Sequence, residues 1–449
     1  MEKIYDLRET HYFQNDTIEK FEYIEIECEN KSDIHKEEAT YNFNIRGEDD
    51  NIFYSDGYLH QQLKITDSKG ESIANKKVSL VNGGGLIKSK KLKIGSTVIE
   101  SNTGYCEILD QVIRQINFTP EYTKSEGKNM LFIPDTYDTV DINKFRYEGV
   151  LIETTKITDF FNNLKINEKY NKGFDKRYYF TKNSQTVHIW IPLKYIFDFF
   201  NEYRKVLSGF HVRMEFERNH SKNMLITNEV NPDFRVEVEN ISLLLPYVQF
   251  RNDARIRFEE LKTLKSYIDI YWDHFRINVT NTQLKVSNGS WPIPTEWDEV
   301  SAVYIVPQYL ERADDYKKNN LIFDNLNIIE YWITVNGQDY PEKHYKVDFP
   351  KKAYNHSYTA VLKAGNNGFT SETGSNISYE AFGELYPILC IDLSAHKNLA
   401  FLNKRILYFN WKLQSNTQKD YRFYVILKER NKCYLNMYKN EFTFAKKDD

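Results

Sequence analysis

The chain has 449 residues, and its 60 Lys and Arg residues nearly balance its 64 Asp and Glu residues, giving a formal net charge of -4. A chain of this length can bury two or three separate cores. So balanced a charge excludes the global basic field by which many proteins attract nucleic acid. The 33 Tyr and 29 Phe residues outnumber the 11 Pro and 18 Gly. Because aromatic residues suit pleated, half-buried surfaces, this composition favours a β-rich fold.

Cysteine spacing and hydropathy indicate the compartment and whether the chain spans a membrane. The four cysteines are Cys28, Cys106, Cys390 and Cys433; they form no C-x-x-C pair and have no neighbouring Cys or His at metal-ligand spacing. They predict free thiols in a reducing compartment, because disulfides are rare inside cells; pairing across the fold is the alternative. The N-terminus lacks the apolar run of a signal peptide, and no stretch has the ~18 uncharged apolar residues of a membrane span. We therefore expect a soluble protein with no membrane span.

Short runs of alternating apolar and polar residues recur along the chain, which is the pattern of strands with one face in a core. In the first half they cover residues 24–28, 41–45, 59–65, 78–81, 187–191, 212–216 and 236–238. In the second half they cover residues 275–279, 302–306, 328–335, 406–413 and 421–427. Strands this short and numerous, separated by polar loops, favour sandwiches or jelly rolls over alternating βαβ units.

Three segments have helical periodicity instead. From Gly104, the run YCEILDQVIRQIN places five apolar residues on one stripe: Ile108, Leu109, Val112, Ile113 and Ile116. From Pro192, the run LKYIFDFFNEYRKVL does the same, with Gly209 as a stop, through Ile196, Phe197, Phe200, Tyr203 and Leu207. The run FEELKTLKSYI from Phe258 is a third candidate.

These segments divide the chain into an N-terminal arm with the first strand (1–39), a first β domain (40–250) and a second (251–449). No low-complexity linker separates the two domains, so we expect them to pack together. Residues 92–101 (LKIGSTVIES) and 333–342 (ITVNGQDYPE) both combine a strand, a tight turn and an extended exit at comparable depths in the two halves. This echo indicates two similar β domains in tandem.

The second of these turns has a specific interpretation. Asn336 and Gly337 supply the two residues that a tight hairpin needs at positive φ. Pro341 cannot donate a ladder hydrogen bond, so we expect the chain to leave the sheet there as a loop.

A glycine-rich and lysine-rich segment, VNGGGLIKSKK (residues 81–91), invites comparison with a phosphate-binding loop. A P-loop needs G-x-x-x-x-G-K-[ST] between a strand and a helix, so that backbone amides and the lysine converge on phosphates. Gly85 is followed by Leu86 and by no helical pattern, which predicts a strand-connecting loop. Residues 88–93 (KSKKLK) are interpreted as a solvated basic loop, with contact to a phosphate backbone or an import signal as the alternatives.

Two further segments contain side chains of catalytic or ligand-binding types. Asp392, Ser394 and His396 are adjacent, but no G-x-S-x-G elbow surrounds the serine, so a strand end with a capping serine is predicted. Trp291 and Trp297 in SWPIPTEW have the side chains that stack on sugars, whereas a rigid loop packed on a neighbouring element is the preferred interpretation.

Paired carboxylates complete the inventory. Glu259-Glu260 and Asp314-Asp315 are neighbours in sequence, but glycosidase acids face each other across a cleft, so adjacency carries no catalytic meaning. The ten histidines are dispersed, with no H-x-H or H-E-x-x-H pair. We therefore predict no catalytic, cofactor-binding or metal-binding residues, no cofactor, and no enzymatic activity.

Residues 328–349 (IIEYWITVNGQDYPEKHYKVDF) resemble a block in the major capsid proteins of Polinton (Maverick) elements and adintoviruses, where a strand ends in V-N-G before a proline and D-F. The resemblance continues through Tyr354, Tyr358, the glycine- and asparagine-rich residues 364–374, NISYEAF (376–382), IDLS (391–394), 407–413 and 421–427. More loosely similar segments in the first half are FNIRGEDDN (43–51), YLHQQLKI (58–65), LVNGGGL, YRKVLSG and FHVRMEFERN (210–219). Together these similar segments extend the resemblance over most of residues 20–445.

The resemblance implies the all-β double jelly-roll fold shared with adenovirus hexon and with virophage and tailless-phage capsid proteins. That fold has two tandem eight-stranded jelly rolls with a few short helices in loops. It implies a major capsid protein that forms pseudo-hexameric homotrimers and tiles an icosahedral shell around double-stranded DNA. Several loops that form capsomer towers in larger relatives are short in this sequence.

The partners implied are neighbouring capsomers, penton and minor capsid proteins, and packaged DNA touched by basic loops without base-specific contacts. The implied location is the virion, assembled inside the host cell. The alternative function is a non-enzymatic carbohydrate-binding or cell-attachment jelly-roll protein.

Overall fold

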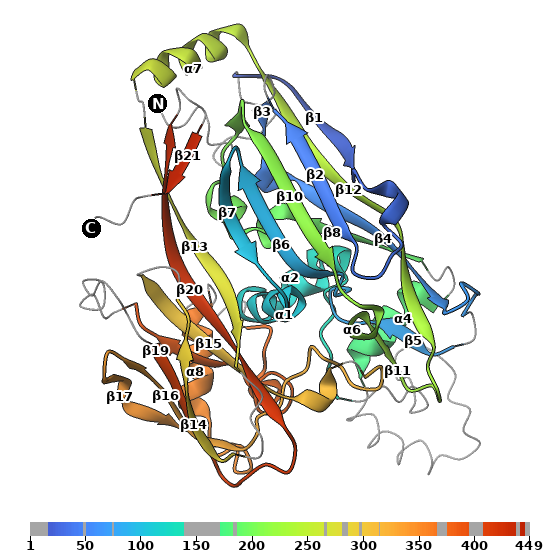
Figure 1. Ribbon diagram of the computed structural model, residues 1–449, viewed down its shortest axis with the longest axis vertical. Helices are drawn as coiled ribbons and strands as arrows, with labels where there is room; N and C mark the ends of the chain where they lie inside the picture. The colour runs from blue at the N-terminus through green and yellow to red at the C-terminus, as the bar shows by residue number, and fades with distance from the viewer. Residues whose placement is uncertain are drawn as a thin grey trace.

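The computed structural model is an elongated β structure (Figure 1). It describes residues 17–47, 51–73, 76–138, 171–182, 186–264, 267–280, 286–295, 299–313, 315–365, 375–394, 407–436 and 441–444. Helix α7 (Asn252–Leu264) stands at one end, where the chain passes from the first half to the second.

The first half forms two main antiparallel sheets and one small one. One sheet has the order β8-β4-β12-β3-β9, with β1 also paired to β12. The second has the order β2-β10-β6-β7, and β11 pairs with β5. The strands are β1 (Ile18–Glu27), β2 (Thr40–Arg46), β3 (Asn51–Ile52), β4 (Tyr58–Asp67), β5 (Val78–Leu80), β6 (Ile87–Ile94), β7 (Thr97–Asn102), β8 (Thr186–Pro192), β9 (Leu207–Ser208), β10 (His211–Arg218), β11 (Leu225–Thr227) and β12 (Phe234–Phe250).

The second half forms two antiparallel sheets. One has the order β13-β20-β15-β18, with β21 also paired to β20, and the other has the order β14-β19-β16-β17. The strands are β13 (Tyr267–Val279), β14 (Asn288–Ile293), β15 (Val300–Tyr309), β16 (Ile328–Val335), β17 (Gln338–Lys346), β18 (Leu389–Asp392), β19 (Leu407–Leu413), β20 (Tyr421–Asn436) and β21 (Glu441–Phe444).

The two halves repeat one pairing scheme. When the short strands are set aside, the first strand of each half pairs with the last (β1 with β12, β13 with β20), and the next strand pairs with the last but one (β2 with β10, β14 with β19). The remaining ladders also correspond: β12-β4-β8 matches β20-β15-β18, and β10-β6-β7 matches β19-β16-β17. Each half is thus an eight-stranded sandwich with added short strands, which confirms the expected fold of two tandem jelly rolls. The hairpins that echo each other in sequence, β6-β7 and β16-β17, occupy equivalent positions.

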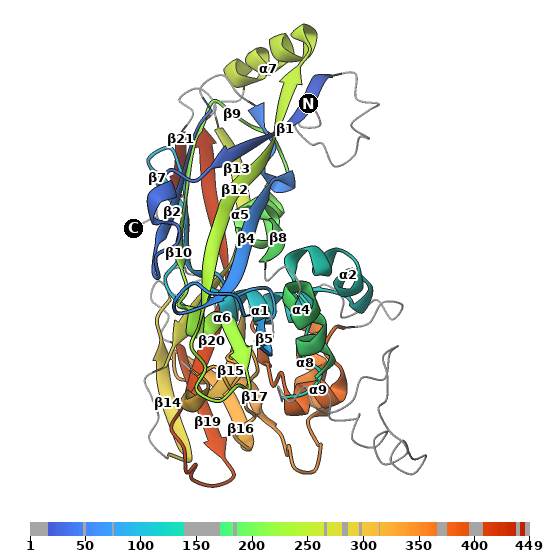
Figure 2. The ribbon, with the colours of Figure 1, turned by 90° about the vertical axis from the view of Figure 1, so that its right-hand side faces the viewer.

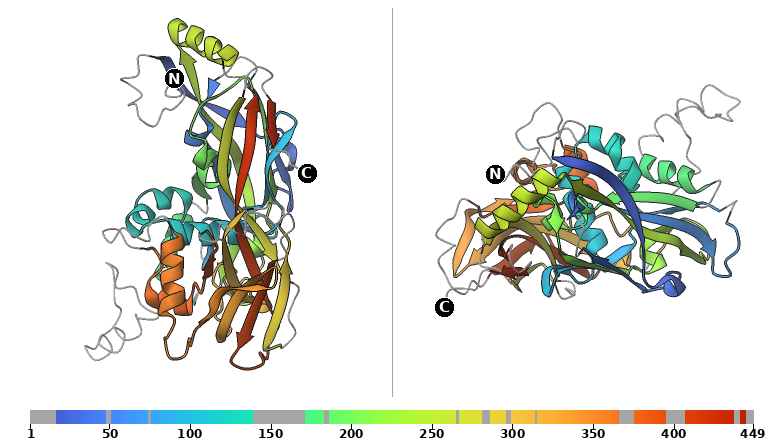
Figure 3. Two further views of the ribbon diagram at one scale, coloured as in Figure 1. Left: turned by 90° about the vertical axis from the view of Figure 1, so that its left-hand side faces the viewer. Right: turned by 90° about the horizontal axis from the view of Figure 1, so that it is seen from above.

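Helices are inserted at equivalent points of the two rolls. Helices α1 (Cys106–Asn117), α2 (Pro120–Lys124) and α4 (Lys172–Lys182) lie between β7 and β8, whereas α8 (Asn355–Ala364) and α9 (Tyr379–Glu384) lie between β17 and β18. Figure 2 and the left view of Figure 3 show α2, α4, α8 and α9 gathered on one flank of the sheets. Helix α1 confirms the first helical prediction, and four residues of its stripe are buried: Ile108, Leu109, Val112 and Ile116.

The helix expected after Pro192 is wrong in extent. The chain forms a short 3-10 turn (Leu193–Tyr195) and the five-residue helix α5 (Asp198–Glu202), and Leu207 already belongs to β9. Helix α5 begins where it does because the Glu100 carboxylate, from β7, accepts the backbone N–H groups of its first two residues. Helix α7 begins before Phe258, at Asn252, and Tyr267 is already in β13, so the third helical prediction placed both ends too late.

The basic run predicted as a solvated loop is instead strand β6. A register shift at Lys88, between the pairs Arg218-Ile87 and Glu217-Ser89, lets Lys88 and Lys90 lie in different surroundings although they are two residues apart. The Lys90 ammonium is buried and lies 3.1 Å from Asp110 Oδ1, while Lys88 Nζ lies 2.8 Å from Glu217 Oε1 at the surface. The strand was not predicted because its lysines looked solvent-exposed in the sequence. A buried lysine needs a charged partner, and the sequence pattern does not show where that partner lies.

Pro341 does not end strand β17. Tyr340 pairs with Ile333 and Tyr345 pairs with Tyr331, so residues 341–344 bulge out opposite Trp332 and the strand then resumes to Lys346. Because β17 is the outer strand of its sheet, a proline without an N–H is tolerated there. The expectation of a loop exit is therefore replaced by a long bulge.

The apolar cores do not divide where the strand pairing does. Strand β20 extends alongside both halves with β13 paired to it (Figure 1), and each strand contributes side chains to two cores. Ile270 and Trp272 of β13 and Cys433 and Leu435 of β20 pack in the core of the first half. Ile277 of β13 packs in the core of the second half. Two strands of the second roll thus also form part of the core of the first roll, and we call this pair, β13 and β20, the strap.

Candidate functional site

A cluster of charged side chains lies where β13 passes from one core to the other. Inward-facing positions along β13 read Ile270, Trp272 and His274, so an imidazole follows two apolar side chains on the same face. Glu429 of β20 is the cross-strand partner of His274 and is also buried. Buried polar groups thus mark the boundary between the two cores.

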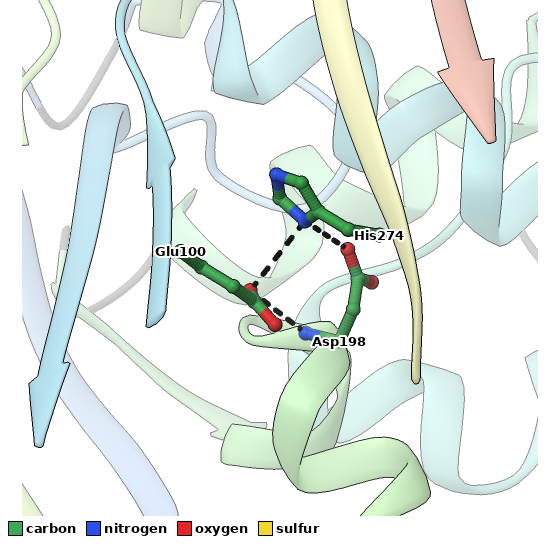
Figure 4. A group of neighbouring side chains, drawn as sticks. All are labelled: Glu100, Asp198 and His274. Carbon is green, nitrogen blue, oxygen red and sulfur yellow. Dashed lines mark hydrogen bonds and ion pairs between the residues drawn. The ribbon is translucent and has the colours of Figure 1, made fainter. Parts of the chain in front are cut away.

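Three elements bring the cluster together (Figure 4). His274 Nδ1 lies 3.0 Å from Asp198 Oδ2, at the start of α5, and 3.8 Å from Glu100 Oε2, on β7. The Phe275 N–H donates to Asp198 Oδ2 at 2.9 Å. The Asp198 N–H donates to Glu100 Oε2 at 3.1 Å, and the Phe199 N–H donates to the other Glu100 oxygen. Two elements of the first half and one of the second are therefore joined by polar contacts.

The cluster binds protons more strongly than its isolated groups would. Burial, reinforced by the neighbouring Asp198 carboxylate, raises the pKa of Glu100 to about 7. Burial alone would lower the pKa of His274, but the hydrogen bond to Asp198 and the charge of Glu100 outweigh it, so that the pKa of His274 is raised. Both effects follow from placing carboxylates around an imidazole out of contact with water.

A second set of ion pairs borders the first. Asp110 of α1 accepts from Lys90 at 3.1 Å and from Arg114 at 3.1 Å. Asn102 of β7 donates from Nδ2 to the Phe275 carbonyl oxygen at 3.1 Å. These contacts tie α1 and β7 to the same stretch of β13 and extend the polar boundary.

Glu100, Asp198 and His274 are of the residue types that hold metal ions. Their ligand atoms all lie within 4.8 Å of one another, and carboxylate oxygen and imidazole nitrogen are donors that Zn²⁺ accepts. The atoms that would face a cation are, however, already bonded within the protein: His274 Nδ1 to Asp198, and the Glu100 oxygens to two backbone N–H groups. The geometry fits an ion-paired joint between the two halves.

A cavity of about 350 Å³ opens beside this joint. Its walls combine aromatic rings (Phe118, Tyr122, Tyr195) with Lys90 and Asp198. No Ser, Cys or His is among the described residues that line it, so the nucleophile and base of a serine or cysteine hydrolase do not meet there.

The residues singled out by sequence do not converge on one site. Gly83, Gly84 and Gly85 all have positive φ and connect β5 to β6, which confirms the strand-connecting loop. At the end of β18 the Ser394 N–H donates to Asp392 Oδ1 at 2.9 Å, in agreement with the predicted strand end, and the residues that follow Ser394 lie outside the described residues. His396 lies outside the described residues.

The remaining candidates have structural surroundings. Trp291 is half-buried against the core of the second half, as the packing interpretation predicted, but it belongs to strand β14 and not to a loop; Trp297 lies outside the described residues. Glu259 and Glu260 are exposed on α7. Asp315 accepts from the Lys317 N–H, and Asp314 lies outside the described residues. The four cysteines are buried free thiols, as predicted, and the reducing compartment stays a prediction.

Sequence reasoning missed Glu100, Asp198 and His274. Their separation in the chain hides them, since Asp198 and His274 are 76 positions apart. One signal was available: His274 interrupts the apolar inward face of β13, and a buried histidine needs a hydrogen-bond partner.

No described helix is long and apolar enough to cross a membrane.

Comparison with known proteins identifies the architecture. Residues 129–428, about two thirds of the chain, match the model of the double jelly roll-like domain. A chain in the cryo-EM structure of the Sputnik virophage is 10% identical with a TM-score of 0.60, over 98% of this chain and 91% of that one. The Faustovirus major capsid protein is 10% identical with a TM-score of 0.55, over 94% and 91%. The PBCV-1 virus capsid model gives 10% identity and a TM-score of 0.52, over 97% and 99%. No curated protein matches the sequence.

Proposed function

Because this chain belongs to the double jelly roll-like family, we propose that it is a viral major capsid protein of the Polinton or adintovirus kind. The observation that carries the proposal is the fold similarity over nearly the whole chain to structures of virus particles and a major capsid protein. The match includes both rolls and the connection between them. The block at residues 328–349 supports the narrower assignment to the Polinton group.

The proposed mechanism is self-assembly. Residues 40–250 and 251–449 form two similar domains, with residues 1–39 as an arm and first strand, so three chains supply six rolls around a pseudo-hexameric capsomer. Capsomers then tile an icosahedral shell that encloses double-stranded DNA. The matching strand ladders of the two halves support this arrangement, since near-equivalent units fill a pseudo-sixfold ring.

The proposed partners are the other two chains of the trimer, neighbouring capsomers, penton and minor capsid proteins, and packaged DNA touched without base-specific contacts. The proposed location is the virion, after assembly inside the host cell. The protein acts without catalysis or a cofactor. The ion-paired joint and the strap of β13 and β20 support this structural role, because a shell subunit must hold its two rolls in one fixed relation.

The test is the mass of the purified protein by light scattering after gel filtration, with negative-stain images of the same peak. We expect a trimer of three chains of 53.5 kDa with hexagonal outlines, or closed shells. A protein that stays monomeric across salt and pH overturns the assembly proposal. Binding on a glycan array would then favour the carbohydrate-binding alternative.

A further inference from the structure

Strand β17 departs from regular pairing at its middle. Residues 341–344 bulge out opposite the single residue Trp332, and the ladder resumes at Tyr345. Strand β17 is the outer strand of its sheet, so no strand among the described residues holds the bulge from the other side. Glu342 and Lys343 are exposed at its tip. Something other than ladder hydrogen bonds must hold this part of the strand.

His344, the last residue of the bulge, returns to the sheet and lies flat on Trp332. The ring centroids are 4.0 Å apart and the planes differ by 3°. His344 Nδ1 lies 3.1 Å from Glu330 Oε1, on β16, and His344 Nε2 lies 3.0 Å from Asp339 Oδ2, at the start of β17. The imidazole thus spans the bulge, with one carboxylate at each nitrogen.

This geometry specifies the charge of the ring. A neutral imidazole has one N–H donor and one lone pair, whereas the imidazolium has two N–H donors. Ionised carboxylates only accept hydrogen bonds, so a neutral His344 would hold a lone pair against a carboxylate oxygen at about 3 Å. Only the doubly protonated ring satisfies both contacts.

The surroundings keep both carboxylates ionised. Lys412 Nζ, from β19, lies 2.7 Å from Glu330 Oε2, and with His344 it lowers the pKa of Glu330. The Thr334 hydroxyl donates to Asp339 Oδ1 at 2.6 Å, and with His344 it lowers the pKa of Asp339. Lys346, the exposed cross-strand partner of Glu330, and the exposed Glu342 and Lys343 of the bulge are further charged residues near the pair. The order of charges is Lys412, Glu330, His344, Asp339, alternating in sign.

We propose that His344 is a proton-dependent clamp that closes the bulge of strand β17 and releases it when the imidazole becomes neutral. Release removes the polar contacts of His344 with Glu330 and Asp339 and leaves the stacking on Trp332 as its contact to the sheet, so residues 341–344 are held less firmly. The inference is independent of the proposed function, because it concerns one hairpin of one chain.

The test is amide hydrogen exchange of the segment 338–346 in the intact protein, corrected for the intrinsic pH dependence of exchange. Between about pH 6 and about pH 8.5 the wild-type protection should fall about three- to tenfold, because a charge-assisted hydrogen bond at a partly exposed site is lost. His344→Gln should show low protection at both values. His211→Gln, at an exposed position on β10, is the matched control and should retain the wild-type fall.

A second variant distinguishes the effect of protonating His344 from the effect of its ring packing on Trp332. Asp339→Asn offers a side-chain N–H that can donate to a neutral imidazole, so the bulge should stay protected at both pH values. Wild-type protection that is equal at the two pH values overturns the clamp. The clamp is also overturned if protection of His344→Gln or of Asp339→Asn falls between the two pH values as much as that of the wild type.

Discussion

His274 Nδ1 lies 3.0 Å from Asp198 Oδ2, and this contact joins strand β13 of the second half to helix α5 of the first. The two residues meet where the apolar cores of the halves meet, with Glu100 beside them. A charged contact at this boundary fixes how the two rolls are oriented, because hydrogen bonds require a specific geometry whereas apolar packing tolerates sliding.

Removing Asp198 should destabilise the protein. In Asp198→Ala the buried imidazole and the Phe275 N–H lose their acceptor, and we expect the free energy of unfolding to fall by about 2 kcal/mol, less than for a fully buried pair because Asp198 is partly exposed. Urea unfolding measures the change. Lys351→Ala, which removes an exposed ion pair with Asp348, is the control and should leave stability unchanged. Equal effects of the two variants would contradict a special role for the joint.

The joint should make stability fall as pH rises. Both Glu100 and His274 have a higher pKa in the folded chain, so the folded protein binds their protons more tightly than the unfolded chain does. Their stabilising effect is therefore complete at low pH, and it is lost as pH rises through about 7 for Glu100 and beyond the ordinary histidine range for His274. Unfolding free energies measured from about pH 5 to about pH 8 test this.

Glu100→Gln is the matched variant for that experiment, because the amide imitates the protonated acid. Its stability should vary less with pH than that of the wild type. If both proteins show the same slope, the pH dependence arises elsewhere in the molecule.

Trp272→Ala should damage the first half although the residue belongs to a strand of the second. Its side chain is 0% exposed and contacts Phe199 edge to face, with ring centroids 5.4 Å apart. The cavity should cost about 3–5 kcal/mol. Hydrogen exchange should show the loss in β2 and β10 as well as in β13. Trp291→Ala, at a half-buried position, should cost less. Loss of protection confined to the second half would contradict the strap.

Gly337→Val should destabilise the β16-β17 hairpin through its backbone. Gly337 has φ +84, Asn336 has φ 49, and no atom lies within 4 Å of a side-chain carbon placed at Gly337, so strain and not a clash is expected. The cost should be about 1–2 kcal/mol, with insoluble or monomeric protein as the result. Gly337→Asn, which tolerates positive φ, should be milder. Normal soluble trimers of the valine variant would contradict the turn assignment.

Local signals predicted many of the strands, helix α1 and the Asn336-Gly337 turn, but not strand β6 along the basic run. Alternation of apolar and polar residues reports which face of a strand meets a core, and positive φ at a turn restricts the residue type; both depend on neighbours in sequence. The core stripe of α1 was predicted for the same reason. The resemblance at residues 328–349 added the relation between the halves, which alternation alone does not specify.

What lies far apart in the chain was decided by the tertiary structure. Glu100 determines where α5 begins, Asp110 neutralises the buried Lys90, and the Asp198-His274 contact closes the boundary between the cores. In each case a charged or hydrogen-bonding group is satisfied by a partner from another strand or helix. Periodicity records whether a side chain is buried, but the free energy of a buried polar group depends on which partner it meets, and only the folded chain brings that partner within 3 to 4 Å.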